Sequence, residues 1–221
     1  MEGIDAKYSA FSLELIDELP ALLAADKQLR GLNVTTPYKE AVIPYLDELH
    51  PDAAAIAAVN CIAVGDGRLT GYNTDWAAFR DSIHPLLKPY HVKALILGTG
   101  GASRAVRYAF EQMGIPFQTV SRSKEKADLV YEEVSRELLS SIPIIVNTTT
   151  LGTMGKGCPE LPYDAITAAH LLYDLVYNPP LPPFLSEGQC RGAAVMNGQQ
   201  MLALQAEASW RIWEAQPGHR P

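Results

Sequence analysis

The sequence predicts an α/β fold with an N-terminal α/β domain, a doubly wound parallel-sheet domain, and a C-terminal helix that returns to the first domain. Three observations predict it. Short apolar runs alternate with longer amphipathic stretches, which is typical of parallel strands joined by helices. One apolar run ends in the glycine cluster Gly98-Thr99-Gly100-Gly101, and a helical pattern follows it. Before it lies a hairpin signal, Gly65-Asp66-Gly67, because glycine accepts the positive φ of such turns.

The first ninety residues carry a mixed pattern of strands and helices. Pro85 is expected to kink or end the last helix of this part, and Asn73-Thr74-Asp75 to cap its start. The expected strands are residues 6–13, 31–35, 60–64 and 68–72, and the expected helices are residues 14–25, 52–59 and the stretch from 73 to 87.

The middle of the chain predicts the parallel sheet. After the glycine cluster, apolar residues recur at helical spacing from Ala102 to Met113, and Gly114 stands where a helix C-cap is expected. The pattern divides the chain into residues 1–84, 85–197 and 198–221. The expected strands are residues 92–97, 117–120, 142–146 and 171–176, and the last helix is expected over residues 199–213.

Composition excludes several classes of protein. The chain has 221 residues, of which 48% are hydrophobic and 19% charged, so it is globular rather than disordered. Its formal net charge of −7 argues against nucleic-acid and membrane-surface partners. No apolar run approaches the roughly 20 residues that span a bilayer. The start lacks the pattern of a signal peptide.

The cysteines favour a reducing compartment. Cys61, Cys158 and Cys190 are odd in number and widely spaced, which suggests neither a disulfide framework nor a zinc site. We therefore expect a cytoplasmic protein without a metal. Its expected oligomeric state is a monomer or a homodimer.

The glycine cluster predicts a dinucleotide site in a Rossmann-like domain. Gly98 permits a tight turn, Gly100 lets backbone amides approach a pyrophosphate, and the helix N-terminus favours an anion. A flexible turn is the alternative. The strand before the cluster and the helix after it favour the dinucleotide.

The segment after the next strand indicates NADP rather than NAD. An NAD site usually has an acidic residue there to bind the ribose 2′-hydroxyl. Here the segment reads Ser121-Arg122-Ser123-Lys124-Glu125-Lys126, with Arg122 and Lys126 able to meet a 2′-phosphate. A solvated basic loop is the alternative.

Two further residues are ambiguous when each is taken alone. Lys39 falls in the first turn of a helix for which Pro37 suits the first position, and such a lysine is commonly a solvated surface residue. Asp75 is most simply a helix N-cap.

Read together, seven segments resemble the motifs of shikimate dehydrogenases, in order and over nearly the whole chain. Residues 98–105 fit that family's G-x-G-G-x-x-x-A loop, and residues 146–152 resemble its Asn-Ala-Thr-Pro-x-Gly segment. The other five segments are residues 32–39, 58–60, 71–75, 173–177 and 197–206.

The resemblance implies reversible NADP-dependent reduction of 3-dehydroshikimate to shikimate in aromatic biosynthesis. It makes residues 1–84 the substrate domain and implies Lys39 and Asp75 as the catalytic pair, since hydride addition to a ketone requires a proton donor near the developing alkoxide. Tyr177 and Gln205 alone would read as packing residues. The implied substrate-binding residues are Thr35, Asn60, Tyr177 and Gln205; the implied NADP-binding residues are Gly98, Gly100, Gly101, Ala102, Ser121, Arg122, Ser123, Lys126, Thr148, Thr149, Leu175, Gly198 and Met201.

The chain departs from the family pattern mainly at its start. Family members open with a strand and helix carrying Ser-x-Ser-Pro, whose hydroxyls bind the substrate carboxylate. Ser9 and Ser12 are spaced differently, so we do not assign them this role. We expect that a βα unit of roughly 25 residues is missing, by typical element lengths. Thr150 and Thr153 replace the family's frequent proline and methionine.

Three alternatives stay open, and the first of them follows from this departure. The alternatives are an NADP-binding module without catalysis, a quinate/shikimate dehydrogenase, and another two-domain enzyme such as methylene-tetrahydrofolate dehydrogenase. Arg122 and Lys126 argue against an NAD-preferring quinate enzyme. Folate enzymes lack the Asn-Val-Thr-x-Pro-x-Lys and Asn-Thr-Asp pair.

Overall fold

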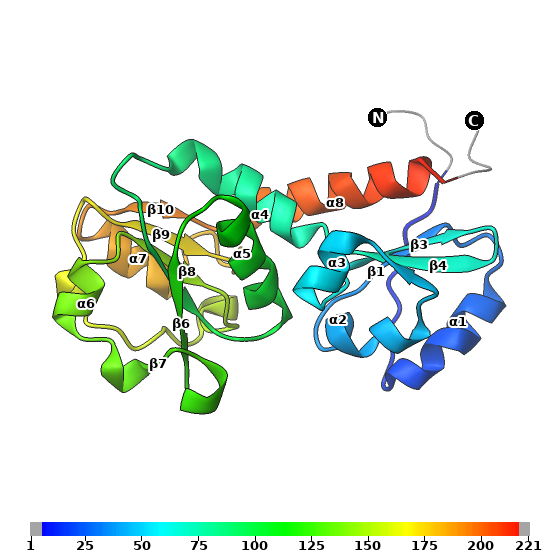
Figure 1. The fold of residues 1–221 in the computed structure, drawn as a ribbon, viewed down its shortest axis with the longest axis horizontal. Coiled ribbons are helices and arrows are strands. Elements are labelled where there is room, and N and C mark those ends of the chain that lie inside the picture. Colours follow the sequence, from blue (N-terminus) through cyan, green and yellow to red (C-terminus); the bar gives the residue numbers. More distant parts are fainter. Residues whose placement is uncertain (1–5, 217–221) are drawn as a thin grey trace.

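Two sheets organise the computed structural model, which describes residues 6–216 (Figure 1). The smaller sheet has the order β1-β3-β4-β2, and a hairpin at its centre pairs β3 with β4 as expected. Its strands are β1 (Gly31–Asn33), β2 (Glu48–Leu49), β3 (Cys61–Gly65) and β4 (Arg68–Tyr72). The helices beside it are α1 (Leu19–Ala25), α2 (Tyr38–Ala41) and α3 (Pro51–Ile56).

The larger sheet has six parallel strands in the order β10-β9-β8-β5-β6-β7. The chain therefore runs outward from β5 first to one edge and then to the other, which is the doubly wound order the sequence predicted. Its strands are β5 (Ala94–Leu97), β6 (Phe117–Ser121), β7 (Leu129–Val130), β8 (Ile144–Asn147), β9 (Leu171–Asp174) and β10 (Ala194–Met196).

Helices cover both faces of this sheet. Along β5, Ala94 and Ile96 belong to one hydrophobic cluster, and Leu95 and Leu97 belong to the other, because successive strand residues point to opposite faces. The first cluster includes side chains of α4 (Asp75–Ile83), α5 (Gly101–Gln112) and α8 (Gln199–Glu214). The second includes side chains of α6 (Arg136–Ser140) and α7 (Pro183–Gln189).

The last helix returns to the smaller sheet, as the sequence predicted. Figure 1 shows α8 beside α4, extending from the large sheet across to the other half. Near its end, Trp213 donates its indole N–H to the carbonyl of Ile62 at 2.9 Å. A Cβ added to Gly31 would lie 2.0 Å from the Trp213 Nε1. Glycine at position 31 therefore allows the indole to lie directly against β1.

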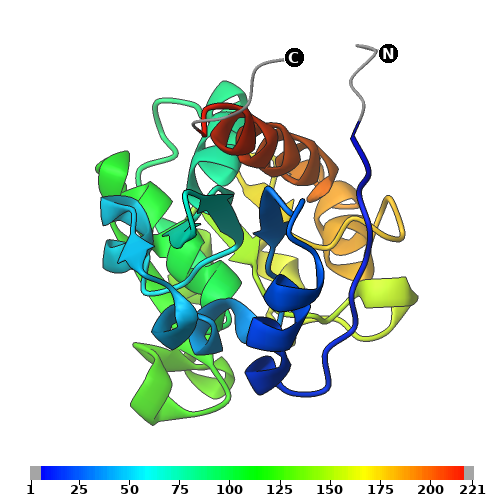
Figure 2. The ribbon, with the colours of Figure 1, turned by 90° about the vertical axis from the view of Figure 1, so that its right-hand side faces the viewer.

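The expectation of a strand at residues 6–13 is wrong. This segment has no regular secondary structure, and Figure 2 shows it running down one side of the molecule without joining a sheet. Tyr8 is 75% exposed, and its hydroxyl donates to Asn33 Oδ1 at 3.2 Å. Alternating apolar residues form a strand only where a neighbouring strand supplies hydrogen bonds, and no ladder partner exists for this segment among the described residues.

Other differences are smaller. The helix expected over residues 14–25 is a 3-10 turn, Ile16–Glu18, followed by α1. Pro37 is the N-cap of α2 instead of its first residue. The helix expected over residues 52–59 is α3, which ends at Ile56, and its C-cap Ala57 has a φ of +55°. The elements β2, β7, β10, α6 and α7 were not predicted. The division at residues 84 and 197 stays a prediction.

In the described part of the chain, no helix is long and apolar enough to cross a membrane.

Candidate active site

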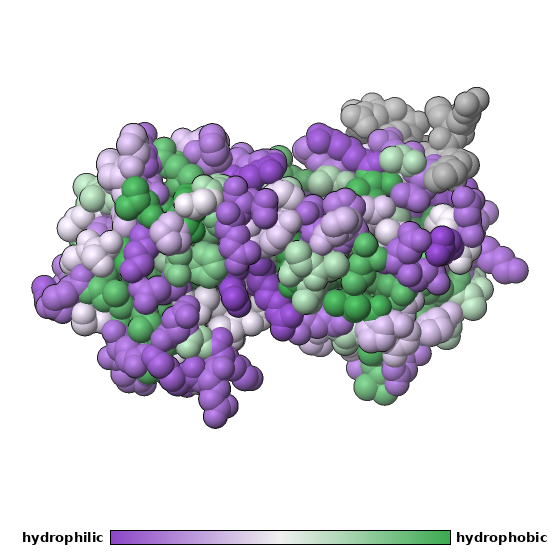
Figure 3. All heavy atoms as spheres, in the orientation of Figure 1, coloured by the Kyte–Doolittle hydropathy of each residue, from purple (hydrophilic) through white to green (hydrophobic). Residues whose placement is uncertain are grey.

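The start of α5 lies against α2 and the end of α3, at the boundary between the two halves of the molecule. A Cβ added to Gly101 would lie 3.6 Å from the Lys39 Cβ and 3.9 Å from the Ala58 Cβ. Figure 3 shows hydrophilic side chains concentrated along this boundary between the two halves. The predicted glycine loop and the predicted lysine are therefore neighbours, although they lie about sixty residues apart in sequence.

Lys39 and Asp75 form a close ion pair. The Lys39 Nζ lies 2.6 Å from the Asp75 Oδ2, and the two side chains are 16% and 8% exposed. Asp75 is the first residue of α4 rather than its cap. The Asn73 carboxamide oxygen accepts from the Asp75 backbone N–H at 3.1 Å, which leaves the Asp75 carboxylate available to Lys39. An ammonium group held this way is a proton donor of fixed position beside the glycine loop.

Asn60 joins this pair to α4 and α8. Its Nδ2 donates to Asp75 Oδ1 and to the Thr74 hydroxyl, both at 2.9 Å, and its Oδ1 accepts from the Thr74 N–H at 2.6 Å. The Gln205 Oε1 reaches the same Nδ2 at 3.5 Å. Three of the predicted polar residues, Asn60, Asp75 and Gln205, thus meet at one point together with Lys39.

We expect Asn60→Ala to weaken both stability and turnover. The change leaves the buried Thr74 N–H without an acceptor, which costs about 1–3 kcal/mol of unfolding free energy. It also releases Asp75, so kcat should fall by about tenfold or more, since catalytic groups lose efficiency when they are misplaced. Urea unfolding and steady-state kinetics measure the two effects. Wild-type values for both would show that Asn60 does not hold the pair.

Thr35 and Tyr177 stand apart from this cluster. Thr35 is exposed just before α2, and Tyr177 is 49% exposed three residues after β9. Neither side chain hydrogen-bonds to the other predicted substrate residues within the part of the chain described. Their assignment stays a prediction from the resemblance.

The glycine loop has the geometry of a phosphate cradle. Gly98 has φ of +108°, and a Cβ added there would lie 2.7 Å from the Thr148 hydroxyl oxygen. A Cβ on Gly100 would meet nothing within 4 Å, so the backbone is open to a ligand on that side. Gly101 and Ala102 begin the twelve-residue helix α5, whose first N–H groups are unpaired within the helix.

Thr148, which follows β8, lies against the glycine loop, and the residues after β9 lie against the start of α8. Thr148 donates its hydroxyl to the Leu97 carbonyl at 2.6 Å, next to the loop. A Cβ added to Gly198 would lie 2.1 Å from the carbonyl oxygen of Leu175, which brings the start of α8 against the end of β9. Met201 is buried in the core below this contact.

Two polar residues that end buried strands form a buried pair, which the sequence did not single out. Asn147 ends β8 and Asp174 ends β9, both fully buried. The Asn147 amide donates to Asp174 Oδ1 at 2.9 Å, and its oxygen accepts from the Thr149 N–H and hydroxyl at 3.0 and 2.7 Å. Asp174 Oδ2 has no hydrogen-bond partner within residues 6–216, and burial raises the pKa of Asp174 to about 7. The signal was a polar residue ending an otherwise apolar strand.

The basic segment begins where β6 ends. The Ser121 hydroxyl oxygen accepts from the Ser123 N–H at 3.1 Å, which turns the chain after the strand. Lys124 forms an ion pair with Glu133 at 2.6 Å. Within residues 6–216, Arg122 and Lys126 belong to no ion pair and are exposed.

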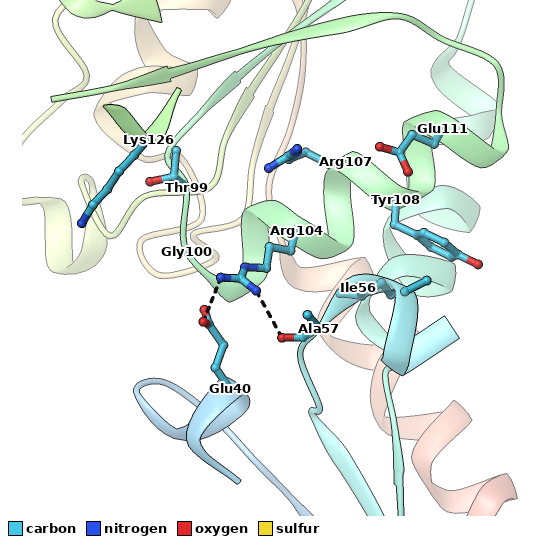
Figure 4. A pocket seen from close by; sticks show the side chains of 11 residues that line it. Glu40, Ile56, Ala57, Thr99, Gly100, Arg104, Arg107, Tyr108, Glu111 and Lys126 are labelled. Atoms are coloured by element: carbon cyan, nitrogen blue, oxygen red, sulfur yellow. Dashed lines mark hydrogen bonds and ion pairs between the residues drawn. The ribbon is translucent and has the colours of Figure 1, made fainter. Parts of the chain in front are cut away.

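A cleft of about 710 Å³ opens between Lys126 and α3 (Figure 4). The sequence did not single out Arg104, which spans it: its guanidinium lies 2.8 Å from the Glu40 carboxylate and 3.4 Å from the Ala57 carbonyl oxygen. The residues lining the cleft are Glu40, Ala55, Ile56, Ala57, Thr99, Gly100, Arg104, Arg107, Tyr108, Glu111 and Lys126.

Comparison with known proteins gives consistent results. The family model described as the shikimate dehydrogenase substrate binding domain matches residues 1–62. A shikimate dehydrogenase (NADP(+)) of Pelodictyon phaeoclathratiforme is 37% identical, covering 96% of this chain and 82% of the relative.

Solved structures are similar in fold as well. Shikimate 5-dehydrogenase of Thermus thermophilus, in complex with NADP(H) and shikimate, is 32% identical with a TM-score of 0.80, covering 93% of this chain and 80% of that one. Quinate dehydrogenase of Corynebacterium glutamicum, in complex with NAD, is 26% identical with a TM-score of 0.80, covering 90% and 77%.

Proposed function

The chain belongs to the shikimate dehydrogenase family, and we propose that it reduces 3-dehydroshikimate reversibly to shikimate with NADPH. The observation that carries the proposal is the Lys39–Asp75 ion pair, held 2.6 Å apart beside the glycine loop of a doubly wound sheet. A ketone bound there would have a proton donor next to its oxygen and a dinucleotide site next to its carbon.

The residues of the loop fit the cofactor. Gly100 leaves space toward the ligand side, and Gly98 allows Thr148 to approach closer than any side chain at position 98 would permit. We assign the pyrophosphate to Gly98, Gly100, Gly101 and Ala102, and the 2′-phosphate to Ser121, Arg122, Ser123 and Lys126. Thr148, Thr149, Leu175, Gly198 and Met201 would form the wall beside the nicotinamide.

Lys39 carries the proton transfer in this proposal. When bound, NADPH supplies a hydride to the carbonyl carbon. Negative charge then develops on the carbonyl oxygen, and Lys39 stabilises it and donates a proton from Nζ. Asp75 orients Lys39 through the contact between Nζ and Oδ2, and Asn60 holds the second Asp75 oxygen.

Substrate hydroxyls would bind to polar groups around this pair. We assign Asn60 and Gln205 to the ring hydroxyls because both lie at the Asp75 carboxylate. Thr35 and Tyr177 complete the proposed set. The thiols of Cys61, Cys158 and Cys190 are all free, which supports our placement of the enzyme in the cytoplasm.

The proposal is tested by following NADPH absorbance with shikimate and NADP⁺. We expect turnover with this pair and much less with quinate or with NAD⁺. Isothermal titration with NADP⁺ and with shikimate separates the alternatives. Binding of NADP⁺ without binding of shikimate at millimolar concentration would identify a non-catalytic module and refute the proposed activity.

A further inference from the structure

Arg107 lies in the cleft between Lys126 and α3, although no motif contains it. It is on α5, one turn after Arg104, and lines the cleft together with Thr99, Gly100 and Lys126. Figure 4 shows its guanidinium directed toward the Thr99 end of the cleft. Side chains of a helix lean toward its N-terminus, so this direction is the ordinary one for a long side chain at position 107.

The charge of Arg107 is not neutralised by an ion pair among the described residues. Arg104, by contrast, is paired with Glu40 at 2.8 Å. The guanidinium of Arg107 lies 5.8 Å from the centre of the Phe117 ring, a contact that leaves its positive charge in place.

Two carboxylates lie near Arg107 without forming an ion pair with it in the described chain. Glu111 lines the same cleft. Asp128 accepts hydrogen bonds from the Thr119 N–H and hydroxyl, which lower its pKa, and the positive charge of Arg107 adds to this effect. Arg107 and Lys126 both line one cleft, and neither forms an ion pair within residues 6–216.

The position of Arg107 along α5 indicates which group of the cofactor it would contact. Arg107 is seven residues beyond Gly100, which is roughly 10 Å along the helix axis, by the helical rise. The pyrophosphate is expected at the helix N-terminus, whereas the Arg107 guanidinium lies 5.8 Å from the ring of Phe117 on β6, the strand that ends at the proposed 2′-phosphate site. Lys126, which our proposed function assigns to the 2′-phosphate, is the residue that shares the cleft with Arg107.

We propose that Arg107 is a specificity-determining residue that binds the ribose 2′-phosphate of NADP from the α5 side of the cleft, opposite Lys126. This inference rests on the proposed function. A dianionic phosphate between two unpaired cations forms charge-assisted hydrogen bonds that NAD, with a hydroxyl there, does not form. Arg107 thereby adds to the preference for NADP that our proposed function assigns to residues 121–126.

The test is isothermal titration of the whole chain with adenosine 2′,5′-bisphosphate and with 5′-AMP. In Arg107→Ala, we expect the Kd for the bisphosphate to rise about tenfold and the Kd for 5′-AMP to stay within about twofold. Arg107→Lys should keep most of the affinity, because it keeps the charge. Arg211→Ala is the matched control: it removes the same charge from an arginine side chain that is 76% exposed near the end of α8.

Two outcomes overturn the inference. Unchanged affinity for the bisphosphate in Arg107→Ala excludes a contact with the 2′-phosphate. An equal loss for both nucleotides indicates a contact with the shared 5′-phosphate or adenosine instead. Neither outcome touches the proposed activity, which the wild-type assay decides. A wild-type chain that binds the bisphosphate through Arg107 without oxidising shikimate would refute the activity and keep the inference.

Discussion

Replacing Lys39 with alanine should lower kcat about a thousandfold, while the Kd for NADP changes by no more than about twofold. A positioned general acid contributes about 10²- to 10⁴-fold to a proton transfer, and Lys39 also places positive charge where the alkoxide develops. Its 2.6 Å contact with Asp75 fixes the ammonium group at that point. The loss should therefore appear in kcat rather than in cofactor binding.

The matched control is Lys27→Ala, which removes the same charge from an exposed lysine after α1. Asp75→Asn should resemble Lys39→Ala, because it keeps the shape of the side chain and removes the charge that orients Nζ. Steady-state kinetics with shikimate and titration with NADP⁺ measure both quantities. If Lys39→Ala and Asp75→Asn turn over at the wild-type rate, the assignment of the catalytic pair is wrong.

The proposed Lys39–Asp75 pair was predictable only from the family resemblance, because each residue taken alone has a simpler interpretation. Lys39 follows a strand and a proline at a helix start, and Asp75 follows Asn73-Thr74 at another. The segments that contain them resemble family motifs and precede the glycine loop in the family's order. Local signals predicted the hairpin, the central βα unit and the returning helix α8. Each of these elements is long or bounded by glycine or proline, which makes its pattern distinct.

Arg107 and Asp174 were not predictable in this way, because their surroundings form only in the folded chain. Arg107 looks like any exposed helical arginine until α5 lies beside Lys126 and Thr99. Asp174 meets Asn147 across two parallel strands, 27 residues away. The short edge strands β7 and β10, with two and three residues, have no periodicity to detect.

Residues 6–13 show the opposite error. Their alternation of apolar and polar residues resembles a strand, yet no strand pairs with them in the described chain. A strand depends on its neighbour, and a single sequence segment does not report whether the neighbour is present. The prediction for the glycine loop was correct, because the turn and the helix after it are determined by local sequence and need no neighbouring strand.

The burial of Asp174 predicts a strong pH dependence of stability. Its pKa in the folded chain is raised to about 7 by burial, against 3.8 for the ordinary side chain. The folded chain thus binds this proton more tightly than the unfolded chain does. The stabilisation that results is fully present below pH 3.8 and is lost as the pH rises through about 7. Above that pH, the folded chain holds a buried carboxylate whose Oδ2 has no hydrogen-bond partner among the residues that the structure describes.

Asp174→Asn should remove this dependence. Asparagine keeps an oxygen to accept from Asn147 and from the Val176 N–H, and it does not ionise. Two pH units separate pH 5 from the folded-state pKa of about 7, and each unit changes the unfolding free energy by about 1.4 kcal/mol. Relative to wild type, the variant should therefore gain about 3 kcal/mol of unfolding free energy between pH 5 and pH 8.

Urea unfolding of both proteins at pH 5, 6, 7 and 8 measures this gain. Asp128→Asn is the control of opposite sign: hydrogen bonds from the Thr119 N–H and hydroxyl lower the pKa of Asp128. Stability from such a carboxylate is already complete above pH 5, so this variant should lose a constant amount across the range. Parallel curves for wild type and Asp174→Asn would mean that Asp174 titrates alike in the folded and unfolded chains, which its burial and its unpartnered oxygen make physically costly.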